Sequence, residues 1–103
     1  MRKHIAIRCN YGKIEVSRLK ELLYSQNYTG EFDLFIKYFH KEEIGFHKDN
    51  ENRIVFAYEA EDKYIYWLFV DFEADLNERV GKHRKIRSVS IDYFDPERDY
   101  RNG

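Results

Sequence analysis

Two runs of aromatic and β-branched residues, separated by three polar residues, constrain the fold of this chain more than any other feature. The runs cover residues 53–60 and 64–72, and Glu61, Asp62 and Lys63 lie between them. Such residues favour strands, and a short polar connection between two strand-like runs is typical of a β-hairpin. The second run is apolar at odd and even positions alike, so we expect both of its faces to be covered and its place in the sheet to be central.

The first quarter of the chain predicts a strand and then a helix. Apolar residues alternate with polar ones over residues 4–9, which is the period of a half-buried strand. Residues 10–12 include asparagine and glycine, which favour a turn after this strand. Leucines recur at spacings of three and four over residues 16–25. This spacing predicts a helix, for which Ser17 can act as the N-cap.

The next segment is ambiguous. Residues 31–40 fit a helical face and a strand face equally well, and we favour a helix because a charged stretch and Gly45 follow as a plausible stop. Residues 47–52 are polar and predict a turn-rich loop. Residues 85–94 alternate again and predict a last strand, which Pro96 ends because proline cannot donate to a strand ladder.

Together these elements predict an α+β domain. Their order is β-α-α-β-β-β, which implies a mainly antiparallel sheet with helices packed on one face. The chain has 103 residues, 43% of them hydrophobic, which suits one core and is far richer in apolar residues than a disordered segment. We therefore expect a single compact domain over residues 1–96 and a frayed tail over residues 97–103.

The net charge and the cysteine content limit the partners and the cellular compartment that we expect for this chain. Lysine and arginine number 18 against 19 acids, so overall charge demands neither nucleic-acid nor membrane binding. Cys9 is the only cysteine, which excludes an intramolecular disulfide and fits a reducing compartment. The sequence shows neither the apolar run of a signal peptide nor one of the roughly 20 residues that cross a bilayer. We expect a cytoplasmic protein with no membrane contact and no cofactor.

Candidate catalytic and metal-binding groups form no recognisable motif. His40, Glu43 and His47 would share a face only on a continuous helix, which Gly45 argues against. A small hydrolase or ribonuclease using His40, His47 or His83 as a base is the last alternative, because no pattern pairs these histidines with one another.

The hairpin is rich in tyrosines and acids. If the helices cover its odd-numbered face, which carries Trp67 and Phe69, then its even-numbered face is left for solvent or a partner. Tyrosine is over-represented among residues that dominate interface energies, and acids attract a basic partner. The predicted protein-binding residues are Tyr58, Glu59, Glu61, Asp62, Tyr64, Tyr66, Asp71 and Glu73.

The sequence therefore favours a non-enzymatic domain that binds a basic protein. A concrete form is an immunity or antitoxin protein, which blocks a basic nuclease toxin by filling its phosphate-binding groove with carboxylates. An alternative is a module for single-stranded RNA or DNA, in which basic side chains hold phosphates and sheet aromatics stack on bases. The residues predicted for that alternative are Lys82, Arg84, Lys85 and Arg87.

Overall fold

The computed structural model describes residues 11–73 and 85–95 of the chain. The elements, in chain order, are β1 (Tyr11–Glu15), α2 (Val16–Ser25), α3 (Thr29–Phe35), β2 (Glu43–Asn50), β3 (Arg53–Glu59), β4 (Ile65–Phe72) and β5 (Ile86–Phe94). The strand predicted over residues 4–9 and the tail predicted over residues 97–103 lie outside the described residues.

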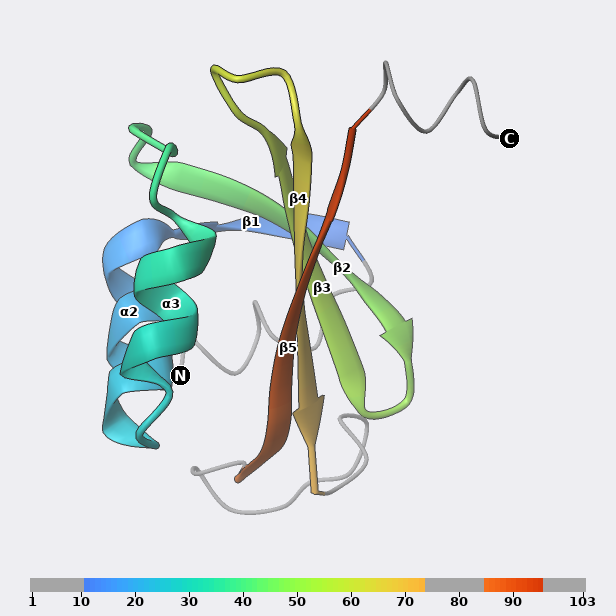
Figure 1. The fold of residues 1–103 in the computed structure, drawn as a ribbon. Helices are drawn as coiled ribbons and strands as arrows, with labels where there is room; N and C mark the ends of the chain where they lie inside the picture. The colour runs from blue at the N-terminus through green and yellow to red at the C-terminus, as the bar shows by residue number, and fades with distance from the viewer. Residues whose placement is uncertain (1–10, 74–84, 96–103) are drawn as a thin grey trace.

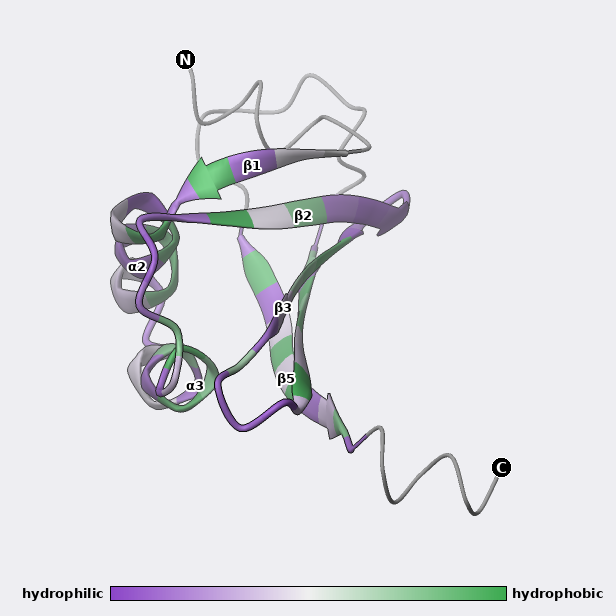
Figure 2. Ribbon diagram, turned by 90° about the horizontal axis from the view of Figure 1, so that it is seen from above, coloured by the Kyte–Doolittle hydropathy of each residue, from purple (hydrophilic) through white to green (hydrophobic). Residues whose placement is uncertain are grey.

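The strands form one antiparallel sheet in the order β1-β2-β3-β4-β5, and both helices come between β1 and β2. Figure 1 shows α2 and α3 side by side on the same side of the sheet. Figure 2 shows how strongly the sheet twists, because β1 and β2 run across the view whereas β3 and β5 run steeply to them. The α+β class is confirmed, and the observed order differs from the predicted one in its additional strand, β2.

The helices differ from their predictions at the ends. The bounds of α2 are as predicted, but its N-cap position is Glu15, so the prediction of Ser17 as the cap is wrong. The chain enters α2 directly from β1, and the backbone N–H of Val16 donates to the carbonyl of Glu42 at 2.7 Å. The second helix exists but ends at Phe35, because Tyr38 and Phe39 turn back to pack on tyrosines of the sheet.

Strand β2 replaces the turn-rich loop predicted over residues 47–52. Only Ile44 and Phe46 point into the core, so the apolar signal of this strand is short. The strand forms because both of its edges are paired, one with β1 and the other with β3. Gly45, predicted as a helix stop, lies within β2 instead.

Strand β1 contains Tyr11 and Gly12, for which a turn was predicted. Gly12 lies opposite Phe46 of β2. A Cβ atom on Gly12 would lie 3.2 Å from Cζ of Phe46, which is closer than ordinary van der Waals contact. Glycine is therefore needed here for the close approach of a core ring and not for a turn.

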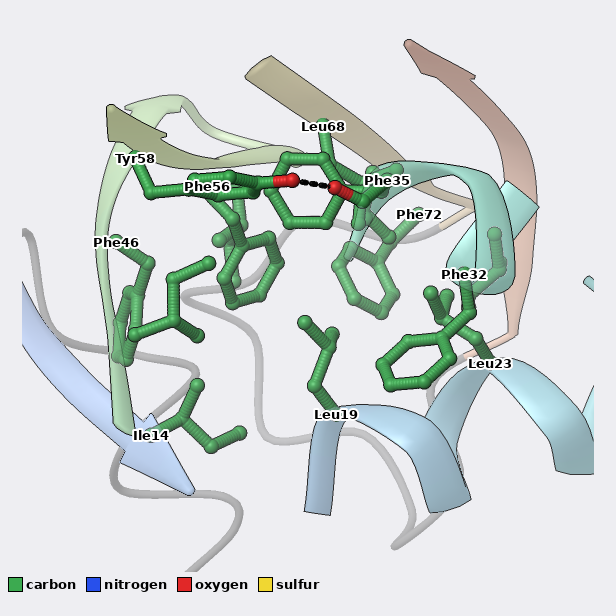
Figure 3. Packing of buried hydrophobic residues seen from close by; sticks show 14 of the residues in the cluster. Ile14, Leu19, Leu23, Phe32, Phe35, Phe46, Phe56, Tyr58, Leu68 and Phe72 are labelled. Carbon is green, nitrogen blue, oxygen red and sulfur yellow. Dashed lines mark hydrogen bonds between the residues drawn. The ribbon is translucent and has the colours of Figure 1, made fainter. Parts of the chain in front are cut away.

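The predicted hairpin is confirmed, with Tyr58 of β3 opposite Tyr66 of β4. The prediction that the helices cover its odd-numbered face is wrong, because the even-numbered side chains face the helices. In Figure 3, side chains from the helices meet side chains from the strands in one apolar layer. The buried core includes Leu19, Leu23, Phe32 and Phe35 from the helices and Phe46, Ile54, Phe56, Tyr58, Leu68, Val70 and Phe72 from the strands.

The odd-numbered side chains of β3 and β4 form the outer face of the sheet. Trp67 and Phe69 are half-buried there, and Val55 is buried. The guanidinium of Arg53 lies 5.3 Å from the ring centroid of Phe69 and forms a bidentate ion pair with Asp71. β4 is an interior strand, as its composition predicted, although the middle strand of the sheet is β3.

Candidate protein-binding surface

Five tyrosines gather at the end of the sheet where β3 and β4 are joined. We call them the tyrosine cluster: Tyr38, Tyr58, Tyr64, Tyr66 and Tyr93. Cross-strand pairing brings three of them together, because Tyr66 of β4 lies opposite Tyr58 of β3 and opposite Tyr93 of β5. Tyr64 shares the parity of Tyr66, and Tyr38 joins from the segment after α3.

Tyr66 is the centre of the tyrosine cluster. Its ring centroid lies 5.5 Å from that of Tyr58, 6.1 Å from that of Tyr93 and 6.3 Å from that of Tyr38. The rings of Tyr64 and Tyr93 stack at 5.3 Å with an interplanar angle of 12°. Separations of this size are those at which aromatic pairs attract each other beyond their buried area. The tyrosines are therefore held in a fixed array.

Asp62 anchors this array to the turn between β3 and β4. Its Oδ2 accepts a hydrogen bond from the hydroxyl of Tyr66 at 2.9 Å, and its Oδ1 accepts one from the backbone N–H of Tyr64 at 3.0 Å. Burial and, after it, the hydrogen bond to Asp62 together raise the pKa of Tyr66 to about 12. Tyr66 thus stays a neutral phenol, donating to Asp62, throughout the physiological pH range.

Exposure increases along the tyrosine cluster from the core outward. Tyr58 is only 8% exposed and donates its hydroxyl hydrogen bond to the carbonyl of Phe35, as the dashed line in Figure 3 shows. Burial raises the pKa of Tyr58 well above its ordinary value. Tyr64 and Tyr66 are half-buried, whereas Tyr38 is 39% and Tyr93 is 52% exposed. Tyr38 and Tyr93 therefore expose ring surface to solvent while they contact Tyr66, which in turn stacks on the buried ring of Tyr58.

Acidic side chains border the tyrosine cluster. Glu61 and Asp62 are exposed in the β3–β4 turn next to the cluster. Glu59 and Asp92 are also exposed at this end of the sheet, but they lie opposite Ile65 and Trp67 and therefore belong to the outer face. Lys63 lies among them in the turn, with a φ angle of 71°. On the far side of the cluster, Nζ of Lys37 lies 5.4 Å from the ring centroid of Tyr38. The turn thus combines apolar ring surface with carboxylates.

The structure brings together some of the predicted protein-binding residues and separates others. Asp62, Tyr64 and Tyr66 are in contact at the β3–β4 turn, Glu61 is exposed in the same turn, and Glu59 lies on the outer face of the sheet. The prediction that Tyr58 is exposed is wrong, because Tyr58 lies under α3 and Phe39.

Asp71 and Glu73 lie at the other end of β4. The strand from Ile65 to Asp71 alone spans about 20 Å at the usual rise per residue. Hydrogen bonds from Arg53 hold the pKa of Asp71 below its ordinary value. Asp71 is thus the partner of Arg53 and Ser88 and is remote from the tyrosine cluster.

Tyr38 and Tyr93 are members of the cluster that the sequence argument did not assign to the surface. The position of Tyr93 could have been predicted, because the alternation over residues 85–94 places Tyr93 on the same face of the strand as Val89 and Ile91, which pack on the core. Tyr93 shares that face but lies where the sheet extends beyond the core. No comparable signal existed for Tyr38, since its position depends on the early end of α3.

The residues predicted for the nucleic-acid alternative are not near the tyrosine cluster where they are described. Lys85 and Arg87 are exposed at the start of β5, and the seven residues from Arg87 to Tyr93 span about 20 Å. Lys82 and Arg84 lie outside the described residues. Lys85 and Arg87 are therefore too far from the stacked rings to bind the same nucleotide.

The histidines do not form a site in the described part of the chain. Glu43 and His47 lie in β2, where four residues span about 13 Å, so the helical spacing that would bring them and His40 together does not exist. Among the described residues, no group of three or more His, Cys, Asp or Glu side chains is placed to hold a metal ion. His83 lies outside those residues.

Three comparisons were made, with protein families, with curated proteins and with solved structures, and none of them gave a match to this chain. Within residues 11–73 and 85–95, neither helix is long and apolar enough to cross a bilayer.

Proposed function

We propose that this chain is a non-enzymatic protein-binding domain that docks a basic partner on the tyrosine cluster. The observation that carries the proposal is the exposure of Tyr38 and Tyr93 beside half-buried Tyr64 and Tyr66, with the carboxylates of Glu61 and Asp62 in the adjoining turn. Tyrosines of this kind bury a large area on binding and lose little side-chain entropy. Here the loss is smaller still, because stacking already fixes the rings.

The acidic border supports a basic partner. Carboxylates at the rim of an interface speed association with a positively charged surface and disfavour negatively charged ones. The same charges disfavour nucleic acid at this surface, since its phosphates would approach Glu61 and Asp62.

A cytoplasmic inhibitor of a basic nuclease, of the immunity or antitoxin type, is the concrete form that we propose. In such a complex the carboxylates of the β3–β4 turn take the place of substrate phosphates in the groove of the enzyme, and the tyrosines supply the apolar contact. The domain itself carries out no reaction in this scheme.

Affinity capture from an extract of the source organism tests the proposal. The immobilised protein should retain a basic protein that elutes as salt rises from 50 to 500 mM, since exposed charge pairs are screened over this range. The double variant Tyr38→Ala/Tyr93→Ala should lose it. The matched control is Tyr24→Ala, because Tyr24 is also exposed, at 36%, but lies on α2 and outside the cluster. A captured nuclease should lose activity when the free protein is added.

Failure of capture, or equal capture by the wild type and the double variant, would contradict the proposal. Circular dichroism of both variants provides the folding control. An RNA or single-stranded DNA retained in place of a protein, with loss on charge reversal at Lys85 and Arg87, would favour the nucleic-acid alternative.

A further inference from the structure

The angles between the rings of the tyrosine cluster indicate which cation it suits. A cage for a spherical ammonium or methylated ammonium group needs rings that are steeply inclined to one another, so that they surround the ion. Here Tyr64 and Tyr93 are inclined by only 12°, Tyr58 and Tyr66 by 18°, and Tyr66 and Tyr93 by 32°. These four rings therefore form a ladder of roughly parallel planes and do not enclose a box, and the ring of Tyr38 is tilted by 44° to that of Tyr66 at its side.

A nearly parallel ladder suits a planar cation. The guanidinium of arginine is flat and stacks on aromatic faces, and its donors form a fork that matches a carboxylate. Tyr93 is half exposed while Tyr64 covers part of its ring, the exposed carboxylate of Asp62 already binds the hydroxyl of Tyr66, and Glu61 is exposed in the same turn. Ring surface and carboxylate oxygens are thus available to one side chain.

The chain itself contains an example of this combination on its outer face. Cζ of Arg53 lies 5.3 Å from the ring centroid of Phe69, and the same guanidinium donates to Asp71 at 2.8 Å and 3.1 Å. One arginine therefore stacks on a ring and binds a carboxylate at once, in a sheet with the same cross-strand spacing.

We propose that the tyrosine cluster recognises arginine in its partner, selecting it over lysine and over methylated lysine. This inference rests on the proposed function, because it names the side chain by which the basic partner is held. The occupant is an arginine-containing segment of another protein. A stacked guanidinium lies along the exposed ladder and pairs with a carboxylate of the β3–β4 turn, whereas the compact ammonium of lysine makes a point contact.

Isothermal titration with defined peptides tests this selectivity. The peptides share one sequence of glycine and serine in which three positions hold arginine, lysine, trimethyllysine or citrulline; citrulline keeps the planar shape and removes the charge. The arginine peptide should bind the wild-type protein about fivefold or more tightly than the lysine or trimethyllysine peptide, and citrulline should abolish binding. Tyr38→Ala/Tyr93→Ala should remove the arginine preference, and Tyr24→Ala should keep it.

Equal binding of the arginine and lysine peptides would overturn the inference, and so would tighter binding of trimethyllysine or no binding of any peptide. These outcomes are separate from failure of the proposed function, which is decided by capture of a cluster-dependent partner. A partner that is captured through the cluster but binds equally well after its arginines are replaced by lysines would leave the function intact and refute the selectivity.

Discussion

The ion pair between Arg53 and Asp71 offers a quantitative test of the structure. The Nε atom of Arg53 lies 2.8 Å from Oδ1 of Asp71, a second guanidinium nitrogen lies 3.1 Å from Oδ2, and the hydroxyl of Ser88 donates to Oδ2 at 3.2 Å. The side chain of Asp71 is 12% exposed and that of Arg53 is 35% exposed. Loss of the arginine therefore leaves a largely buried carboxylate, whereas loss of the carboxylate leaves an arginine that water can reach.

This difference in burial predicts unequal effects on the free energy of unfolding. Removing one partner of a fully buried pair costs roughly 3–5 kcal/mol, and partial exposure of Arg53 reduces this to about 2 kcal/mol for Arg53→Met. Asp71→Asn keeps the shape and one acceptor, so we expect a loss of about 1.5 kcal/mol. The double variant should lose only about 2 kcal/mol, because the second change removes a group that is already without its partner. The coupling energy is then about 1.5 kcal/mol.

Urea unfolding, followed by the fluorescence of Trp67 and by circular dichroism, measures these values. The matched control is the exposed pair Arg18–Glu15, whose side chains are 42% and 61% exposed at a separation of 3.6 Å, and whose coupling should stay below about 0.5 kcal/mol. A coupling energy at Arg53–Asp71 no larger than that of the control would refute the reasoning.

The pH dependence of the coupling follows from the lowered pKa of Asp71. Hydrogen bonds from Arg53 are the main cause of this shift. A carboxyl group with a lowered pKa in the folded state contributes its stabilisation above its pKa in the unfolded chain, which is about 3.9. The coupling should therefore be constant from neutral pH down to about pH 5 and should decrease as the pH falls below about 4 toward the folded pKa. An increase on acidification would contradict the assignment.

Three further predictions concern other parts of the structure. Tyr58→Phe leaves the buried carbonyl of Phe35 without its donor and should lower the free energy of unfolding by about 1–2 kcal/mol in the same urea assay. Gly12→Ala should destabilise the fold by about 1 kcal/mol because its Cβ meets the ring of Phe46. Gly45→Ala should stabilise the fold by about 0.5 kcal/mol, because the nearest atom to the added Cβ is a backbone oxygen at an ordinary contact distance of 3.9 Å. If the two alanine substitutions changed the free energy of unfolding in the same direction, that result would be inconsistent with the β1–β2 register. In ultraviolet titration, the difference between wild type and Tyr66→Phe should show a phenol with a pKa of about 12, and Asp62→Asn should lower this pKa. Ionisation near 10 in the wild type would contradict the burial of Tyr66, and an unchanged pKa in Asp62→Asn would show that Tyr66 does not donate to Asp62.

The sequence predicted the elements whose local pattern is strong. The leucine spacing of α2 and the two long runs of the hairpin need no tertiary information, because the apolar periodicity alone distinguishes helix from strand there. β2 was missed because its apolar residues are few, and pairing on both edges supplies what local propensity does not. The early end of α3 also depends on tertiary contacts, since Phe39 packs against Tyr58 at 4.6 Å.

The choice of the buried face could not be made from β4 alone. This strand offers Leu68 and Val70 to one side and Trp67 and Phe69 to the other, so both faces are apolar. The neighbouring strand carries the asymmetry. On its even-numbered face, β3 presents the large side chains of Ile54, Phe56 and Tyr58. Its odd-numbered face includes the small Ala57 and the charged Glu59. Because antiparallel partners share a face, that difference decides the burial of the whole sheet.

The tyrosine cluster follows from this burial pattern. The residues that fill the core continue along the same face beyond the helices, so the last members of the series, Tyr64 and Tyr93, reach solvent while they still stack on one another. Tyr66 belongs to both regions, because it touches buried Tyr58 and exposed Tyr38. Truncation of Tyr66 would therefore lower stability and binding together. The exposed rings of Tyr38 and Tyr93 are the positions at which loss of binding can be separated from loss of fold.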